Sequence, residues 1–275
     1  MCVELASEFQ HSQMPLHDFD LCILISQSGE TFDILEAYDI IKSHNISTLG
    51  IINVLHSTLA RCVDVTIPLC AGPEIGVAST KAFTAQTAIL YTLAHILKGD
   101  KQVPNFSKVV KSALRNTMGI EKFTMQLIHY KSIFFIGRHL YYPLAMEAAL
   151  KLKEISYMNA QAYAGGELKH GPLALVDLES LVVAFAPLGE LYAKTVSNIQ
   201  ETLARGATVL LLTDDVNAPV DHVNLHRLII PSSLDEDMAL FAMIPMTQLL
   251  AYYSALKLGC SIDKPRNLAK SVTVA

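Results

Sequence analysis

One segment of this sequence has the residue types to bind a phosphate group. Residues 26–31 read SQSGET, after an apolar run and before an amphipathic stretch. Ser26, Ser28 and Thr31 supply hydroxyls, and the start of a helix supplies free N–H groups and the positive end of its dipole. The loop contains no lysine, so it is not a nucleotide P-loop, and a sugar phosphate fits better than ATP. The alternative is a turn and helix cap, where Ser and Thr are common.

Three charged residues have the spacing of one helical stripe. Glu147, Lys151 and Glu154 follow one another at i, i+4 and i+7. On a solvent-facing helix they would form ion pairs that contribute a few tenths of a kcal/mol each. In a cleft, Glu154 could move a proton between neighbouring carbons while Lys151 stabilises developing oxyanion charge. The spacing leaves both alternatives open.

Two loops offer further candidates. Residues 74–81 (EIGVASTK) form a second junction between a strand and a helix, at which Ser79 or Thr80 could cap the helix. Residues 165–172 (GGELKHGP) form a glycine-bracketed loop in which His170 could relay protons near neutral pH. The alternatives are a plain helix cap and a solvated histidine.

The C-terminal segment 264–275 carries three cations and no acid. A frayed tail is the default for a chain end. Pro265 and the mixed apolar residues favour an ordered, extended segment instead. There Lys270 could act as a Schiff-base nucleophile if burial or nearby cations lower its pKa.

Alternating strands and helices must position these residues. Apolar runs of strand length are separated by helical patterns, which predicts a parallel sheet covered on both faces and a three-layer α/β architecture. The predicted strands cover residues 21–25, 48–52, 132–136, 181–185, 209–212 and 228–230, and the predicted helices cover 31–43, 79–97, 143–156, 191–204 and 238–258.

The sequence also contains an internal repeat. Gly29-Glu30 recurs 160 residues later as Gly189-Glu190, and Gly99 recurs as Gly259 at the same offset. Residues 7–9 align with 166–168 at an offset of 159. Evenly spaced anchors indicate a duplication.

The repeat is unequal. In the second half, the strand at 132–136 and the helix at 143–156 precede the aligned anchor, whereas the first half would need them before Met1. We therefore expect two three-layer α/β/α domains with mostly parallel sheets, the first without its opening strand, loop and helix. The expected domains are residues 1–105 and 106–263, followed by a tail, 264–275, that contributes to the active site.

Composition excludes several classes of protein. The 275 residues are 51% hydrophobic and 17% charged, too apolar for a disordered chain. A net charge of −5 and the absence of tryptophan argue against nucleic-acid binding. No apolar run approaches the roughly 18–20 residues that cross a bilayer. The N-terminus lacks the basic region of a signal peptide.

Cysteine and histidine usage indicates a reduced, metal-free protein. The five cysteines form no CxxC pair, and the ten histidines form no HExxH motif. We expect free thiols in the cytoplasm, no metal and no organic cofactor.

Five motifs resemble one family. SQSGET, EIGVASTKAFT, EAALKLKEISY, GELKHGPLAL and PRNLAKSVTV occur in the order found in the isomerase half of the glutamine–fructose-6-phosphate aminotransferases, the glucosamine-6-phosphate synthases. That half is a tandem of two sugar isomerase (SIS) domains. The resemblance covers essentially the whole chain.

The resemblance implies substrate-binding residues. The phosphate of fructose 6-phosphate would be bound by Ser26, Gln27, Ser28 and Thr31, and the sugar pocket would be bordered by Glu74, Val77, Ser79 and Ala269.

It also implies catalytic roles. Glu154 would shuttle the proton between C1 and C2 with help from Lys151. His170 would open the sugar ring in a neighbouring subunit of a homodimer, and Lys270 would form the Schiff base with the ketose. The product in the complete enzyme would be glucosamine 6-phosphate.

Two departures from the family matter. The family begins with a glutamine amidotransferase domain, whereas Cys2 lies in a segment that matches the interior of the isomerase half. The family's Cys-Gly-Thr-Ser loop belongs to the element that the repeat lacks. We therefore expect an incomplete phosphate site and no glutamine-dependent turnover. The alternatives are a non-catalytic sugar-phosphate-binding SIS protein, an inactive fragment of the synthase, or a phosphosugar isomerase without amination.

Overall fold

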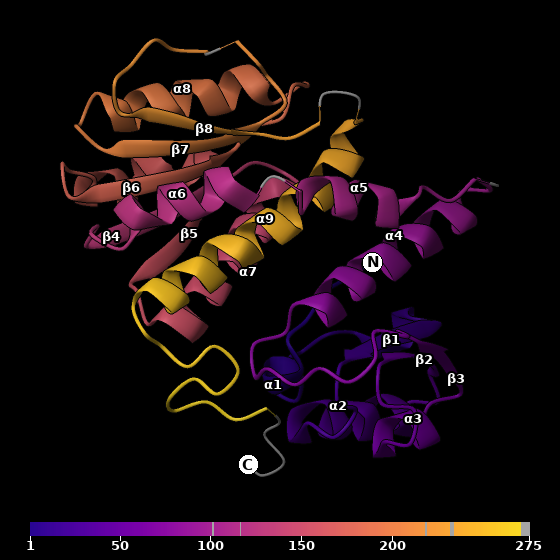
Figure 1. Cartoon of the computed structure of the whole chain (residues 1–275). Helices are drawn as coiled ribbons and strands as arrows, with labels where there is room; N and C mark the ends of the chain where they lie inside the picture. The colour runs from indigo at the N-terminus through magenta and orange to yellow at the C-terminus, as the bar shows by residue number, and fades with distance from the viewer. Residues whose placement is uncertain (101, 116, 218, 232–233, 271–275) are drawn as a thin grey trace. The chain divides into compact units, whose positions relative to one another are not determined.

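The computed structural model describes residues 1–100, 102–115, 117–217, 219–231 and 234–270 (Figure 1). These residues form two compact units. The first unit comprises Met1–Val103 together with residues 267–270, and the second comprises Pro104–Arg266.

The first unit is built on a three-stranded parallel sheet in the order β1-β2-β3, with β1 (Leu21–Ser26), β2 (Ser47–Ile52) and β3 (Val65–Pro68). Its helices are α1 (Ala6–Phe9), α2 (Phe32–Ser43), α3 (Thr58–Cys62) and α4 (Lys81–Leu97), with a 3-10 turn, η1 (Leu16–Asp18). Successive residues of β2 face opposite sides of the sheet. Ile52 packs with α2 and α3, and Ile51 packs with α4.

The second unit has a five-stranded parallel sheet in the order β5-β4-β6-β7-β8. The strands are β4 (Ser132–Gly137), β5 (Ala160–Ala164), β6 (Ser180–Phe185), β7 (Thr208–Thr213) and β8 (Leu225–Ile229). Its helices are α5 (Phe106–Ala113), α6 (Thr117–Leu127), α7 (Tyr141–Ser156), α8 (Tyr192–Leu203) and α9 (Glu236–Lys257), with the 3-10 turns η2 (Gly165–His170) and η3 (Pro172–Leu175). Helix α8 covers one face of this sheet, and α7 packs on α9 at the other (Figure 1).

The two units repeat one another, as the sequence predicted. Helices α2 and α8 begin at Phe32 and Tyr192, 160 residues apart, and α4 and α9 end at Leu97 and Lys257 with the same offset. Strands β1, β2 and β3 therefore correspond to β6, β7 and β8. Within residues 1–100 nothing corresponds to β4 and α7, so the predicted two-domain α/β fold with an incomplete first domain is confirmed.

All six predicted strands and five predicted helices are present, with ends that differ by a few residues. The prediction missed β3 and β5, whose sequences, VTIP and AQAYA, are short, contain proline or carry polar and small residues. It also missed the helices α1, α3, α5 and α6.

Helix α9 corrects the statement that no apolar stretch has the length to cross a bilayer. Residues Asp237–Lys257 have a mean hydropathy of 1.3 and are long and apolar enough to cross a membrane by length and composition. The contacts of α9 with α5, α6 and α7 bury 67% of this stretch inside the protein. Its apolar character is thus accounted for by the core of the second unit.

Candidate functional site

The SQSGET loop lies where the sequence placed it, at the carboxyl end of β1 and the start of α2. The Oγ of Ser26 accepts the N–H of Gly29 at 2.9 Å, and the Oγ of Ser28 accepts the N–H of Glu30 at 3.2 Å. The hydroxyls of Ser28 and Thr31 lie 3.4 Å apart. Ser26 therefore shapes the turn, while Ser28 and Thr31 form a pair of hydroxyls beside the first turn of a helix. Gln27 is half-buried in the same loop.

Glycine is required at the centre of this loop. Gly29 has a φ of +68°, and a Cβ there would lie 2.1 Å from the Oγ of Ser57. The carbonyl of Gly29 accepts the N–H of Leu59, and Oε1 of Glu30 accepts the N–H of Thr58 at 2.7 Å. That backbone hydrogen bond lowers the pKa of Glu30. The loop is therefore held against the start of α3.

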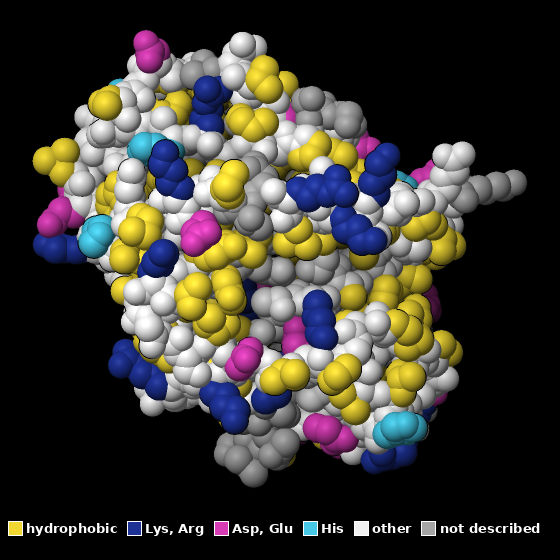
Figure 2. Space-filling view, viewed as in Figure 1, with side chains coloured by type: hydrophobic (Ala, Val, Ile, Leu, Met, Phe, Trp, Pro, Cys, Tyr) yellow, Lys and Arg dark blue, Asp and Glu magenta, His cyan; other side chains and the backbone are white. Residues whose placement is uncertain are grey.

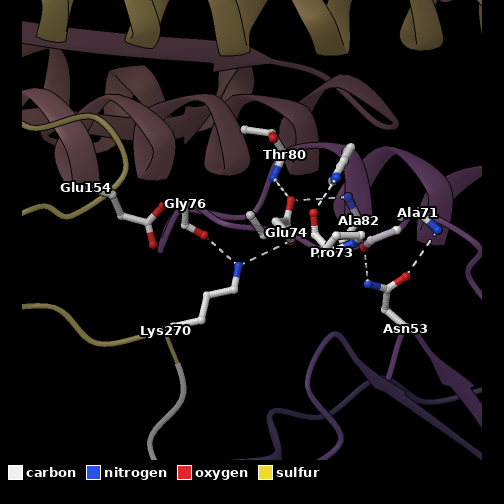
Figure 3. A network of polar contacts seen from close by, with 12 residues as sticks. Asn53, Ala71, Pro73, Glu74, Gly76, Thr80, Ala82, Glu154 and Lys270 are labelled. Carbon is white, nitrogen blue, oxygen red and sulfur yellow. Dashed lines mark hydrogen bonds and ion pairs between the residues drawn. The ribbon is translucent and has the colours of Figure 1, made fainter. Parts of the chain in front are cut away.

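Glu74 organises the junction before α4 (Figure 3). Its Oε1 accepts the N–H groups of Thr80 at 2.8 Å and Ala82 at 3.4 Å, and its Oε2 accepts the hydroxyl of Ser79 at 3.1 Å. The helix is thus capped by a carboxylate that precedes it, not by Ser79 or Thr80, the two candidates from the sequence. The sequence did not predict this cap, because Glu74 reaches the start of α4 only when the intervening loop folds back on itself.

The side chain of Lys270 reaches the same junction. Its Nζ donates to the carbonyl of Gly76 at 2.6 Å and lies 3.5 Å from Oε2 of Glu74 (Figure 3). The side chain of Glu74 is only 4% exposed. Burial by itself would raise the pKa of Glu74, but the hydrogen bonds and the Lys270 ammonium outweigh it and hold the pKa below its usual value.

The loop around Glu74 is itself anchored. The side chain of Asn53 donates to the carbonyl of Gly72 at 2.8 Å and accepts the N–H of Ala71 at 3.1 Å. Lys81 donates to the carbonyl of Pro73 at 2.6 Å. Val77 is half-buried in this loop, and Ala269 is exposed beside Lys270 in the chain. The predicted residues Glu74, Ser79 and Lys270 therefore meet in one polar network of the first unit.

The charged residues of α7 are not a solvent-facing ion-pair stripe. The side chain of Lys151 is only 4% exposed, and its Nζ lies 2.6 Å from Oε2 of Glu154 and 3.5 Å from Oε1 of Glu147. Two carboxyl groups therefore share one buried amine. The first alternative left open by the spacing, an exposed row of ion pairs, is therefore wrong, and the role of Glu154 in proton transfer stays a prediction.

His170 ends η2 and is exposed. The loop before it is held in place, because Leu168 is fully buried and Lys169 pairs with Glu201 of α8 at 2.8 Å. In the part of the chain that is described, no hydrogen bond or ion pair joins His170 to Lys151 or Glu154. The structure thus presents this imidazole at the surface of the second unit on a fixed loop.

The start of the predicted tail is ordered by Tyr157. The N–H of Arg266 donates to the hydroxyl of Tyr157 at 2.8 Å, and the Arg266 guanidinium lies 4.3 Å from the centre of the same ring. Residues 271–275 of the predicted tail lie outside the described residues. The five cysteines are free, as expected.

Comparison with known proteins identifies one family. A model of the SIS domain matches residues 1–96 and 126–258. The glutamine–fructose-6-phosphate aminotransferases [isomerizing] of Methanosarcina acetivorans and Rhizobium leguminosarum bv. viciae are 45% and 42% identical to the chain. The matches cover 99% of this chain but only 46% and 47% of those proteins, so the chain spans about half their length.

Solved structures give the same result. The C-terminal domain of glucosamine-fructose-6-phosphate aminotransferase from Francisella tularensis is 39% identical, with a TM-score of 0.87 over 96% of this chain and 78% of that one. A glucosamine-6-phosphate deaminase from Thermotoga maritima is 28% identical, with a TM-score of 0.81 over 97% of this chain and 80% of that one.

Proposed function

The chain belongs to the SIS domain family and matches the isomerase half of the glutamine–fructose-6-phosphate aminotransferases, and on this premise we propose that it converts fructose 6-phosphate and ammonia into glucosamine 6-phosphate. The observation that carries the proposal is the place of Lys270. Its amine is held by Gly76 and Glu74, in the segment expected to border the sugar, although Gly76 precedes it by 194 residues.

Lys270 is the proposed nucleophile. The ammonium must lose a proton before the amine attacks the C2 carbonyl of the open-chain ketose, and loss of water then gives an imine. Ammonia displaces the lysine from C2 and leaves an imine of the sugar. Until substrate arrives, Glu74 and Gly76 would keep the lysine at the sugar pocket.

Glu154 is the proposed proton carrier. Removal of a proton from C1 and delivery of a proton to C2 turns that imine into an aldose with an amine at C2. The balance is one fructose 6-phosphate and one ammonia consumed, and one glucosamine 6-phosphate and one water formed. The ammonium of Lys151, 2.6 Å from Glu154, would stabilise negative charge that develops on the substrate.

The remaining predicted residues complete the proposal. Ser26, Gln27, Ser28 and Thr31 would hold the phosphate at the start of α2. His170, exposed on a fixed loop, would open the sugar ring in the site of a second copy of the chain. The free cysteines support a reducing compartment, and we propose the cytoplasm.

Borohydride trapping tests the proposal. The chain is incubated with fructose 6-phosphate and sodium borohydride, and peptide mass spectrometry locates the reduced adduct. We expect the adduct at Lys270 and its loss in Lys270→Arg. Lys264→Arg, which changes a lysine of the same tail, should keep it. Fructose 6-phosphate binding without an adduct would favour the non-catalytic sugar-phosphate-binding module instead.

The nitrogen source and the alternative reaction are tested together. With the chain alone, ammonium chloride should support formation of glucosamine 6-phosphate and glutamine should not. Accumulation of glucose 6-phosphate without ammonia, at a rate that ammonia leaves unchanged, would identify a simple phosphosugar isomerase. Turnover with glutamine would show that the chain itself releases ammonia from glutamine, which would contradict the predicted dependence on added ammonia.

A further inference from the structure

Asn53 follows the last residue of β2, the middle strand of the sheet in the first unit. The two residues before it, Ile51 and Ile52, are fully buried on opposite faces of that sheet. The end of the strand is therefore rigid. Open parallel sheets bind ligands at such carboxyl ends. The half-buried side chain of Asn53 reaches from there to the loop that follows β3 (Figure 3).

This loop has a backbone that needs support from outside. Residues 69–80, between β3 and α4, contain neither helix nor strand. Cys70 has a φ of +53°, in the left-handed region that is unfavourable for a residue other than glycine, and Gly72 has a φ of +67°. Such a conformation persists only where neighbouring contacts fix it. The shape of the loop therefore depends on its anchors.

The end of β2 supplies three of these anchors. The N–H of Leu69 donates to the carbonyl of Ile52 at 3.0 Å. The side chain of Asn53 accepts the N–H of Ala71 at 3.1 Å and donates to the carbonyl of Gly72 at 2.8 Å. An amide can do both because it combines an acceptor and a donor in one planar group. One side chain on a rigid strand thus fixes the turn.

The anchored loop in turn holds the proposed nucleophile. Lys and Arg side chains lie widely over the surface seen in Figure 2. The side chain of Lys270 is instead only 30% exposed, with its Nζ 3.5 Å from Oε2 of Glu74 and 2.6 Å from the carbonyl of Gly76. Both partners of this amine belong to the loop that Asn53 fixes.

We propose that Asn53 is a positioning residue for Lys270, an inference that rests on the proposed function. By fixing the turn before Glu74, the amide sets where the carboxylate of Glu74 and the carbonyl of Gly76 lie. These two groups hold the amine at the sugar pocket. A misplacement of about 1 Å can lower a rate by about 100-fold. Loss of the amide therefore slows attack on the ketose more than it weakens binding.

Two reactions of Lys270 test the proposal in Asn53→Ala. Borohydride trapping with fructose 6-phosphate reports the productive geometry. Competitive acetylation by acetic anhydride, read by peptide mass spectrometry, reports how freely the amine moves, with the exposed Lys264 as the internal reference. We expect the maximal trapping rate to fall by about 10–100-fold. Acetylation of Lys270 relative to Lys264 should rise several-fold, because its partners no longer hold it.

The concentration dependence of trapping separates positioning from binding. The fructose 6-phosphate concentration that gives half the maximal rate should stay nearly unchanged in Asn53→Ala. The reason is that the SQSGET loop is held by the N–H groups of Thr58 and Leu59 and not by Asn53.

Two further variants separate positioning from a general loss of stability. Asp64→Asn weakens the hydrogen bonds with Thr48 at the opposite end of β2, so it should lower stability and change neither reaction. Lys81→Met removes the donor to the carbonyl of Pro73 and changes an exposed side chain, so it should fold. It should shift both reactions in the same directions as Asn53→Ala by smaller factors, and it decides the test if Asn53→Ala does not fold.

Different results would overturn the two proposals. An unchanged trapping rate in folded Asn53→Ala, a rise in both reactions, or equal shifts in Asp64→Asn would overturn the positioning role, while the adduct of the wild type upholds the proposed function. Absence of an adduct at Lys270 in the wild type would overturn the proposed function. Freer acetylation of Lys270 in Asn53→Ala would then still uphold its positioning by Asn53.

Discussion

The Nζ of Lys270 lies 3.5 Å from Oε2 of Glu74 (Figure 3). It also donates a hydrogen bond of 2.6 Å to the carbonyl of Gly76, which follows Glu74 by two residues. The same carboxylate caps α4 through the N–H groups of Thr80 and Ala82. One buried acid thus joins a helix start to the lysine that we propose as nucleophile, which makes Glu74 important both for stability and for chemistry.

Glu74→Gln should destabilise the protein and weaken trapping at Lys270. A neutral amide keeps the size of the side chain but loses the charge that strengthens its hydrogen bonds. A hydrogen bond to a charged group contributes about 1.5–3 kcal/mol to stability. We expect a comparable loss in the free energy of unfolding at pH 7, measured by urea denaturation, and slower borohydride trapping. Equal stability of the two proteins at pH 7 would contradict the capping role.

The stability difference between wild type and Glu74→Gln should depend on pH. The folded protein holds the pKa of Glu74 below its usual value of 4.5, so its stabilisation is present above pH 4.5 and is lost as the pH falls through the lower, folded value. The difference between wild type and Glu74→Gln should therefore shrink on acidification. A difference that grows below pH 4.5 would contradict the lowered pKa.

Lys151→Met should be among the most destabilising single substitutions in the second unit. It leaves the carboxyl groups of Glu147 and Glu154 without their buried partner, and breaking a buried ion pair costs about 3–5 kcal/mol. Lys131→Met is the matched control, because the ion pair of Lys131 with Glu179 is exposed and screened by solvent, so its loss should change stability much less. Equal losses in denaturant titrations would mean that the cluster is solvated.

Glu154→Gln should remove catalysis while the protein stays folded. A general acid–base group contributes roughly 10²–10⁴-fold to a rate, so kcat with ammonia should fall by that factor with little change in KM. Exchange of the C1 proton with solvent, followed by NMR, should fall in parallel. Glu147→Gln changes the other carboxylate of the same cluster and should keep most of this exchange.

Ser28→Ala and Thr31→Val should weaken fructose 6-phosphate binding. Their hydroxyls lie 3.4 Å apart beside the start of α2, and one hydrogen bond to a charged phosphate contributes about 1.5–3 kcal/mol, or roughly 10–100-fold in Kd. Calorimetry should show this loss in variants that circular dichroism shows to be folded. Ser43→Ala, at the opposite end of α2, should leave binding intact.

Asp64 should govern part of the acid stability of the first unit. Its Oδ1 pairs with Lys42 at 2.7 Å, and its Oδ2 accepts the N–H and the hydroxyl of Thr48 at 2.8 Å each. The bond from Lys42, with those from Thr48, lowers the pKa of Asp64 from 3.8 to about 2. Asp64→Asn should lower the melting temperature at pH 7, and the difference should disappear between pH 4 and pH 2. A constant difference across that range would show that protonation of Asp64 has no part in it.

Local patterns in the sequence determined the elements and the repeat. Apolar runs of strand length and amphipathic stretches between them predicted β1, β6 and α7, because burial on a sheet or on one side of a helix leaves a periodic trace. The loop at residues 26–31 was also predictable, since its hydroxyls and Gly29 are needed at a turn of fixed shape. Short strands such as β3 and β5 left no such trace, because their pairing comes from neighbouring strands.

Only the tertiary structure decided which charged groups are buried and which residues meet. The spacing of Glu147, Lys151 and Glu154 fits an exposed helix as well as a cluster, and the packing of α7 against its neighbours makes it a cluster. The meeting of Glu74 with Lys270 depends on long-range folding that no local pattern encodes. The exposure of Leu21, Ile23 and Ile25 has the same origin, because an apolar side chain is buried only where another element covers it.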